Sequence, residues 1–414
     1  MSASTPDQVR DVLPGTERPD RYAWKTIWAS AAGYAMDGFD LLILGFALTA
    51  ISATFALRPD QAGSLATITL VGAVLGGFVG GVLSDYVGRV KVLTYSILVF
   101  ALFTALTGLA PNFALLTVFR FIAGVGLGAE FGVGMTLAAE AWPARMRARA
   151  TSYVALGWQS GVLLAAFVSA WAIPAIGWRG LFLLGAIPAV MAFFVRRHVD
   201  EPPIFAARKG GAGGRFPLWL LFADARTTKS SIGMLVLTSV QNFGYYGLMI
   251  WLPSFLAQRY GFGLTKTAVW TGVTILGMAF GIFAFGWLAD RYGRRPLLLI
   301  FQAGAAVSVL AYSQIGSEVG LLVGGAIMGI FVNGMLGGYG ALMAELFPTA
   351  ARATAQNVLF NLGRGVGGFA PLVVGLLTAA YSFQLAIGLL AIIYVIDIVA
   401  TLLLIPERRG MELE

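Results

Sequence analysis

Twelve apolar stretches, separated by short polar segments, constrain this chain more than any other feature. A helix crosses a lipid bilayer with roughly 20 mostly apolar residues, because each residue adds ~1.5 Å of rise. The stretches lack the alternating polarity of barrel strands and are about twice as long as such strands. They predict an all-α membrane protein with twelve transmembrane helices. They cover residues 26–52, 64–84, 92–110, 114–138, 150–173, 179–196, 230–253, 268–289, 297–316, 319–344, 354–378 and 383–405.

Composition excludes most other classes of protein. Of the 414 residues, 58% are hydrophobic and 12% are charged, whereas soluble domains carry about 25% charged residues. The chain has no cysteine and one histidine, His198, so disulfides and thiolate metal sites are ruled out and a histidine metal site is not expected. We therefore expect neither an ordinary soluble enzyme nor a bound metal or cofactor.

The basic residues predict how the chain is oriented. If the N-terminus is cytoplasmic, 22 of the 28 lysines and arginines fall in cytoplasmic segments and four fall in outer loops. Such an asymmetry is the usual signature of membrane topology. We therefore predict a multi-pass protein of the inner membrane with both termini in the cytoplasm, and no nucleic-acid partner despite the net charge of +8.

Two different motifs recur at one spacing. Gly-x-Leu-[Ala/Ser]-Asp-x-x-Gly-Arg occupies 81–89 and 286–294, and Glu-x-x-Pro followed by arginine occupies 140–147 and 345–352, each pair offset by 205 residues. A shared offset indicates an internal duplication, and hence two pseudo-symmetric six-helix bundles with a substrate site between them. The predicted divisions are a tail at 1–25, a bundle at 26–196, a cytoplasmic linker at 197–229, a bundle at 230–405 and a tail at 406–414.

These motifs resemble the loop signatures of the major facilitator superfamily. Within it, Asp37-Gly38-Phe39-Asp40, Gly-Ala-Glu-Phe-Gly at 128–132 and Gly-Trp-Arg at 177–179 resemble the sialate:proton symporter family. That family includes carriers of sialic acid and of lactate or pyruvate. The related metabolite:proton and aromatic-acid:proton symporters share the Asp-Gly-Phe-Asp motif.

The resemblance implies a monomeric, proton-coupled importer of a small organic monocarboxylate, with lactate or pyruvate ranked before sialic or aromatic acids. Its partners would be the organic anion, protons and the bilayer. A neutral sugar:proton symporter is the first alternative. A proton-coupled drug or metabolite antiporter ranks lower, since the fifth stretch lacks the Gly-Pro motif typical of that class. A membrane-bound enzyme or receptor would need a soluble domain for which the chain has no room.

Arg364 is the candidate ligand for the substrate's carboxylate. A charge inside a span is costly, so such residues are usually functional, and a guanidinium binds a carboxylate through two hydrogen bonds. Alternatively, Arg364 serves helix packing and is bridged to a backbone carbonyl of the tenth stretch. The depth of each residue in the bilayer, estimated from the helical rise per residue, places several polar side chains on the same level as Arg364. The predicted substrate-binding residues are Arg364, Asn361, Asn357, Gln159, Gln241, Asn242, Tyr245 and Tyr34.

Four further residues form the predicted proton-coupling set: Asp40, Asp37, Glu130 and Arg120. We expect Asp40 to pair with Arg120, as a similar pair does in proton-coupled sugar porters, unless that pair is permanently closed and structural. Asp37 lies three residues before Asp40 on nearly the same helix face, so one of the two should bind a proton readily. Glu130 has no obvious cation at its depth and is either a proton carrier or a permanently protonated hydrogen-bonding group.

The charged residues of the repeated motifs form a predicted latch on the cytoplasmic side, with anchoring in lipid headgroups as the alternative. They are Asp85, Arg89, Glu140, Arg147, Asp290, Arg294, Glu345 and Arg352. Asp397 in the twelfth stretch is expected to face the bundle, with no assigned role.

Overall fold

The computed structural model describes residues 19–57, 59–187, 200–201, 217–262 and 264–408. Helices account for almost all of these residues, and the described part contains no strand. Ten of its helical segments are long and apolar enough to cross a membrane. The predicted tails, the linker and the sixth stretch lie partly outside the described residues.

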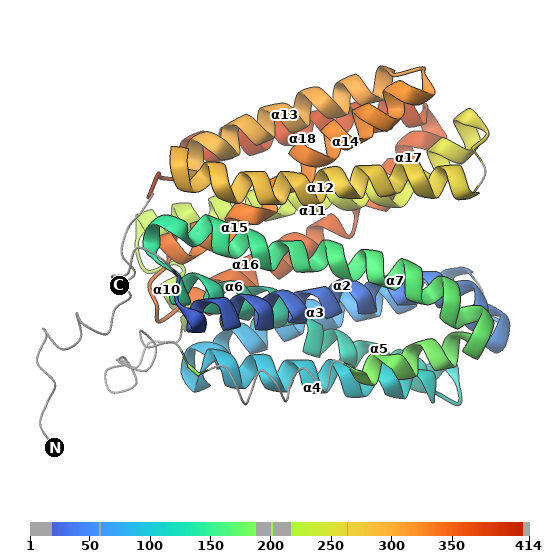
Figure 1. Ribbon diagram of the computed structural model, residues 1–414, viewed down its shortest axis with the longest axis horizontal. Coiled ribbons are helices and arrows are strands. Elements are labelled where there is room, and N and C mark those ends of the chain that lie inside the picture. Colours follow the sequence, from blue (N-terminus) through green and yellow to red (C-terminus); the bar gives the residue numbers. More distant parts are fainter. Residues whose placement is uncertain (1–18, 58, 188–199, 202–216, 263, 409–414) are drawn as a thin grey trace, which may run out of the picture.

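The first half of the chain forms one bundle, coloured blue to green in Figure 1. Most apolar stretches give one helix each, whereas the fourth is divided at Ala129. The fifth helix runs into the start of the sixth stretch through a break at Gly177, whose φ of 72° is non-helical. The helices are α2 (Arg21–Phe55), α3 (Pro59–Val87), α4 (Arg89–Gly108), α5 (Phe113–Gly128), α6 (Glu130–Ala141) and α7 (Arg147–Leu183).

The second half forms a matching bundle, coloured yellow to red in Figure 1. Its tenth stretch is divided at Met335, close to the position equivalent to Ala129. The two halves therefore also match in where their helices are interrupted. The helices are α10 (Pro217–Leu220), α11 (Ala225–Tyr260), α12 (Leu264–Tyr292), α13 (Arg294–Gln314), α14 (Glu318–Gly334), α15 (Leu336–Leu346), α16 (Arg352–Gly367), α17 (Ala370–Ala380) and α18 (Phe383–Leu404).

Glycines set the close approach of helices in the first bundle. A methyl group at Gly128 would collide with the carbonyl oxygen of Ala73, and one at Gly124 with that of Thr69. Small residues allow such contact between membrane helices. Glycines of the fourth stretch therefore allow α5 to pack closely against α3.

Helix α2 begins and α18 ends at the same end of the molecule, on the left in Figure 1. We call it the basic end, because it carries four buried arginines, Arg89, Arg147, Arg294 and Arg352. The predicted topology assigns this end to the cytoplasm.

The two bundles meet most closely toward the basic end. Helix α3 packs along α16, and α7 packs along α12 and α15. Helices α6 and α15, which form the basic-end parts of the fourth and tenth stretches, also touch each other. Their outer continuations, α5 and α14, make no comparable contact with the opposite bundle within the described residues. The structure is therefore closed at the basic end.

Candidate functional site

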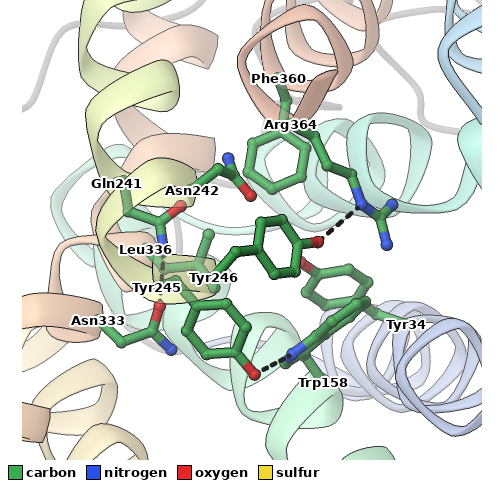
Figure 2. A pocket seen from close by; sticks show the side chains of 10 residues that line it. All are labelled: Tyr34, Trp158, Gln241, Asn242, Tyr245, Tyr246, Asn333, Leu336, Phe360 and Arg364. Atoms are coloured by element: carbon green, nitrogen blue, oxygen red, sulfur yellow. Dashed lines mark hydrogen bonds between the residues drawn. The ribbon is translucent and has the colours of Figure 1, made fainter. Parts of the chain in front are cut away.

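Side chains from both bundles enclose a central cavity, drawn in Figure 2. All of them are buried except Tyr246, which is half-buried. The cavity volume is about 20 Å³, which is enough for one water molecule but not for a metabolite. Tyr34, Trp158, Gln241, Asn242, Tyr245, Tyr246, Asn333, Leu336, Phe360 and Arg364 line it.

Arg364 is the one cation among the described residues that line this cavity. Its Nη1 and Nη2 lie 3.4 and 3.3 Å from the two carboxylate oxygens of Asp37, and its Nε donates to the Tyr246 hydroxyl over 3.3 Å. The guanidinium also lies over the ring of Trp158, 5.1 Å from its centroid. A planar cation between an aromatic face and a carboxylate suits recognition of an organic anion.

This geometry adds a partner that the sequence did not indicate. The ion pair of Arg364 with Asp37 joins α16 of one bundle to α2 of the other. Asp40, three residues further along α2, pairs with Arg120 instead. The sequence gives depths along helices but not which faces of distant helices meet, so this partner could not be inferred.

A second contact across the bundles lies beside the first. Trp158 on α7 donates its indole N–H to the Tyr245 hydroxyl on α11 over 3.3 Å. The rings of Tyr34 and Trp158 lie 5.3 Å apart, and those of Phe131 and Phe360 are stacked at 3.5 Å between bundles. Five of the ten residues that line the cavity are therefore aromatic.

An amide pair forms the far side of the cavity. Gln241 donates to Asn333 over 2.6 Å, while Gln241 Oε1 and Asn333 Nδ2 have no hydrogen-bond partner within the described structure. If O and N were exchanged in both amides, the pair would still be joined by one hydrogen bond and would still leave one oxygen and one nitrogen without a partner. The pair presents one free donor and one free acceptor, and Asn333 was missed by the sequence analysis because its equivalent position in the first half is Gly128.

Three predicted substrate residues do not line the cavity. Asn357 accepts from the N–H of Gly132 over 3.1 Å, and Asn361 donates to the carbonyl of Gly128 over 2.8 Å. These asparagines therefore hold α16 against the break between α5 and α6. Gln159 is buried and lies 4.0 Å from the sulfur of Met278. Of the three predicted substrate residues on α16, only Arg364 therefore faces the cavity.

Asp40 and Arg120 form the predicted ion pair within the first bundle. Arg120 Nη2 lies 2.7 Å from Asp40 Oδ2, and Nη1 lies 3.1 Å from Oδ1. Thr104 donates to the same carboxylate over 2.5 Å, and Thr69 accepts from Arg120 Nε over 3.3 Å. Both charged side chains are buried outside the cavity lining.

Glu130 lies at the first residue of α6, packed against α2 and α4. Ser96 donates to its Oε1 over 2.7 Å, and its Oε2 has no hydrogen-bond partner in the described part of the chain. None of the ion pairs between described residues includes it. Such a carboxyl, 1% exposed, is too costly to bury as an unpaired charge.

Charges at the basic end connect the bundles in two matching networks. Arg352 lies 2.7 Å from Glu140, which also pairs with Arg89 at 3.3 Å. In the mirror arrangement Arg294 lies 2.9 Å from Glu345, and Arg147 lies 4.0 Å from the same carboxylate. The pairs of Arg352 with Glu140 and of Arg147 with Glu345 thus join the two halves, whereas the other two pairs each lie within one half.

The two motif aspartates bind helix N-termini of the opposite bundle. Asp85 accepts from the N–H and the hydroxyl of Thr354 over 2.8 and 2.7 Å at the start of α16. Asp290 accepts from the N–H groups of Ala148 and Arg149, each over 3.1 Å, at the start of α7. A carboxylate is stabilised at a helix N-terminus by the helix dipole, so both contacts hold the basic end shut.

Asp397 faces the interior of the second bundle, as predicted. It is fully buried and accepts from Gln302 on α13 over 3.0 Å.

Comparisons with known proteins give one consistent result. The model of the Major Facilitator Superfamily matches residues 30–277 and 266–412. A protein of Haemophilus influenzae, whose name marks it only as a candidate metabolite transporter, is 58% identical over 406 residues, which span 96% of this chain and 100% of that protein. The cis,cis-muconate transport protein of Acinetobacter baylyi is 31% identical over 398 residues, spanning 94% and 96% of the two chains.

Among solved structures, the proton:xylose symporter XylE bound to 6-bromo-6-deoxy-D-glucose is similar to this chain with a TM-score of 0.81. The match covers 95% of this chain and 98% of that one at 18% sequence identity, so it bears on the fold alone.

Proposed function

Because this chain belongs to the Major Facilitator Superfamily and is therefore a multi-pass membrane transporter of metabolites rather than an enzyme, we propose that it is a proton-coupled symporter of a small organic carboxylate. The carboxylate binds Arg364 in the central cavity. The two bundles rock about this site, so that it opens first on one side of the membrane and then on the other. The basic end faces the cytoplasm, and import follows from the inward proton gradient.

One observation carries the proposal: among the described residues that line the central cavity between the bundles, Arg364 is the one cation, and aromatic rings frame its buried guanidinium. A charge in this position is expensive and therefore functional by default. An organic anion supplies the opposite charge, and the rings of Tyr34, Trp158, Tyr245 and Phe360 supply surface for an apolar body.

The cavity walls favour one part of the substrate range predicted from the sequence. Flat ring surfaces stack best on planar conjugated molecules, so we rank aromatic and unsaturated acids before lactate or pyruvate. The transport of cis,cis-muconate by a relative supports the same ranking. The free donor and acceptor of Gln241 and Asn333 suit a hydroxyl or a similar polar group at the other end of the molecule.

The proposed roles of the remaining charges follow from their positions. Asp37, Asp40 with Arg120, and Glu130 are the carboxyl groups available for proton coupling. The networks around Glu140 and Glu345, with Asp85 and Asp290, act as the latch that keeps the basic end closed while the site is open to the outside.

Uptake into proteoliposomes under an inward proton gradient tests the proposal. We expect transport of aromatic or unsaturated monocarboxylates by the original chain, and its loss in Arg364→Ala and Arg364→Lys, because lysine keeps the charge but not the paired geometry. Arg291→Ala, at an exposed arginine outside the cavity, is the matched control and should transport normally. Carboxylate uptake that survives in both Arg364 variants would contradict the proposal, and uptake of neutral sugars by them would favour the sugar symporter instead.

A further inference from the structure

The ion pair between Asp37 and Arg364 occupies the place that a substrate carboxylate would need. It is buried on both sides, with side-chain exposures of 0% and 3%. It also bridges the two bundles at the cavity, since Asp37 belongs to α2 and Arg364 to α16. The carboxylate of Asp37 is therefore an internal anion already bound at the proposed substrate site.

Both hydrogen-bonding edges of the guanidinium are in use. Asp37 accepts from Nη1 and Nη2, and the Tyr246 hydroxyl accepts from Nε. A carboxylate that binds an arginine through two parallel hydrogen bonds needs one whole edge. A second carboxylate can thus bind in this way only after Asp37 or Tyr246 has given up its contact.

The charge balance favours displacement of Asp37. The empty site contains one positive and one negative charge, and an added substrate anion would leave an uncompensated negative charge in a buried cavity. A proton on Asp37 removes this excess, because Arg364 then pairs with the substrate while Asp37 is neutral. The loaded site has the same net charge as the empty one.

We propose that Asp37 is the residue that couples the proton to the substrate, by competing with the substrate carboxylate for Arg364. This rests on the proposed function of Arg364 as the substrate's ligand. A proton from the outer solution binds a carboxylate oxygen of Asp37, the Arg364 contact passes to the substrate, and both proton and substrate leave together on the other side. Loss of the substrate allows Asp37 to release its proton and pair with Arg364 again.

The other charged groups around Asp37 do not contact the Arg364 guanidinium. Asp40 lies on the same helix and interacts with it electrostatically, but Arg120 holds Asp40 within one bundle. Glu130 on α6 is near enough to interact with Asp37 and is hydrogen-bonded to Ser96. Tyr34 on α2 and the tyrosines of α11 complete the surroundings. Of the carboxyl groups among the described residues, only Asp37 shares the cavity's guanidinium.

Binding measured against pH separates Asp37 from a carboxylate at the exposed start of the same helix. The purified chain is titrated by calorimetry with benzoate, 4-hydroxybenzoate and nicotinate at pH 6, 7 and 8. If one proton must bind with the substrate, the Kd of the original chain rises up to tenfold per pH unit where Asp37 is ionised. Asp37→Asn should bind at least one of these acids with a Kd that changes less than twofold over this range. Asp20→Asn, at the exposed residue that accepts from the N–H of Ala23, is the matched control and should keep the pH dependence of the original chain.

Three results would overturn the inference: a pH dependence that persists in Asp37→Asn, its loss in Asp20→Asn, or no binding of any of the three acids by Asp37→Asn. If Asp37→Asn does not fold, proton uptake by the original chain decides, with close to one proton taken up per substrate bound supporting the inference and none overturning it. The double variant Asp37→Asn/Arg364→Ala distinguishes the two proposals. If it binds as well as Asp37→Asn, the role of Arg364 fails, whereas failure of the pH test alone leaves that role intact.

Discussion

Replacing the motif aspartates should open the basic end by an amount that the structure allows us to estimate. Asp85 receives two short hydrogen bonds from Thr354 at the start of α16, and Asp290 receives two from the start of α7. Asparagine at either position keeps one acceptor oxygen and loses the charge and the other oxygen. Hydrogen bonds to charged groups contribute about 1.5–3 kcal/mol each, so we expect a loss of about 2 kcal/mol per site.

That loss changes the population of the closed state directly. At 1.4 kcal/mol per factor of ten, about 2 kcal/mol corresponds to a shift of about 30-fold toward the open basic end. The two contacts are separate and both break when the bundles part. The variant Asp85→Asn/Asp290→Asn should therefore shift the equilibrium by about 1,000-fold if the effects add.

Spin labels at the basic end measure this shift. The chain has no cysteine, so Lys25→Cys and Arg226→Cys place two labels without background, at exposed positions near the starts of α2 and α11. Double electron–electron resonance should give one short distance in the original chain, a mixture in Asp85→Asn, and mainly a longer distance in the double variant.

A matched control removes a similar carboxylate that does not bridge the bundles. Glu201, at the start of the predicted linker, accepts from the N–H groups of the first three residues of α4, which belong to the first bundle. Glu201→Gln should lower the unfolding temperature and leave the label distance unchanged. An unchanged distance in Asp85→Asn/Asp290→Asn, or an equal change in Glu201→Gln, would show that the two aspartates do not hold the basic end closed.

Three further predictions concern the interior of the molecule. Glu130→Gln should retain substrate exchange across proteoliposomes and lose proton-driven accumulation, and full accumulation would remove this carboxyl from the proton path. Gly128→Leu should lower the unfolding temperature, since the side chain meets the Ala73 carbonyl and overpacking costs about 1–3 kcal/mol; an unchanged temperature would show that the helices can separate without cost. Gln241→Leu should abolish any preference for 4-hydroxybenzoate over benzoate in binding assays, and a preserved preference would place the hydroxyl away from Asn333.

Much of the fold follows from two properties of the sequence. The apolar stretches give the helices, because a bilayer requires that length, and the 205-residue offset gives the two bundles. The offset also holds in detail: Gly88 and Gly293 both have positive φ, at 127° and 101°, and each precedes the arginine that begins the next helix.

Contacts between bundles could not be predicted in the same way. Helix periodicity places Arg364 and Asp37 at similar depths, but the rotation of each helix about its axis depends on packing by all its neighbours. For the same reason, the sequence does not show that Glu140 and Glu345 each pair with an arginine of the opposite half. Asn333 carried a usable signal, a lone amide within an apolar stretch, which the search for repeated motifs passed over.

We expect a substrate carboxylate to bind Arg364 in the place of Asp37. A structure determined with a bromobenzoate bound tests it most directly, because the bromine identifies the ligand and its orientation. The carboxylate should lie within about 3 Å of the Arg364 guanidinium, with Asp37 displaced from it. A ligand bound elsewhere, or bound while the pair between Asp37 and Arg364 stays intact, would contradict the account.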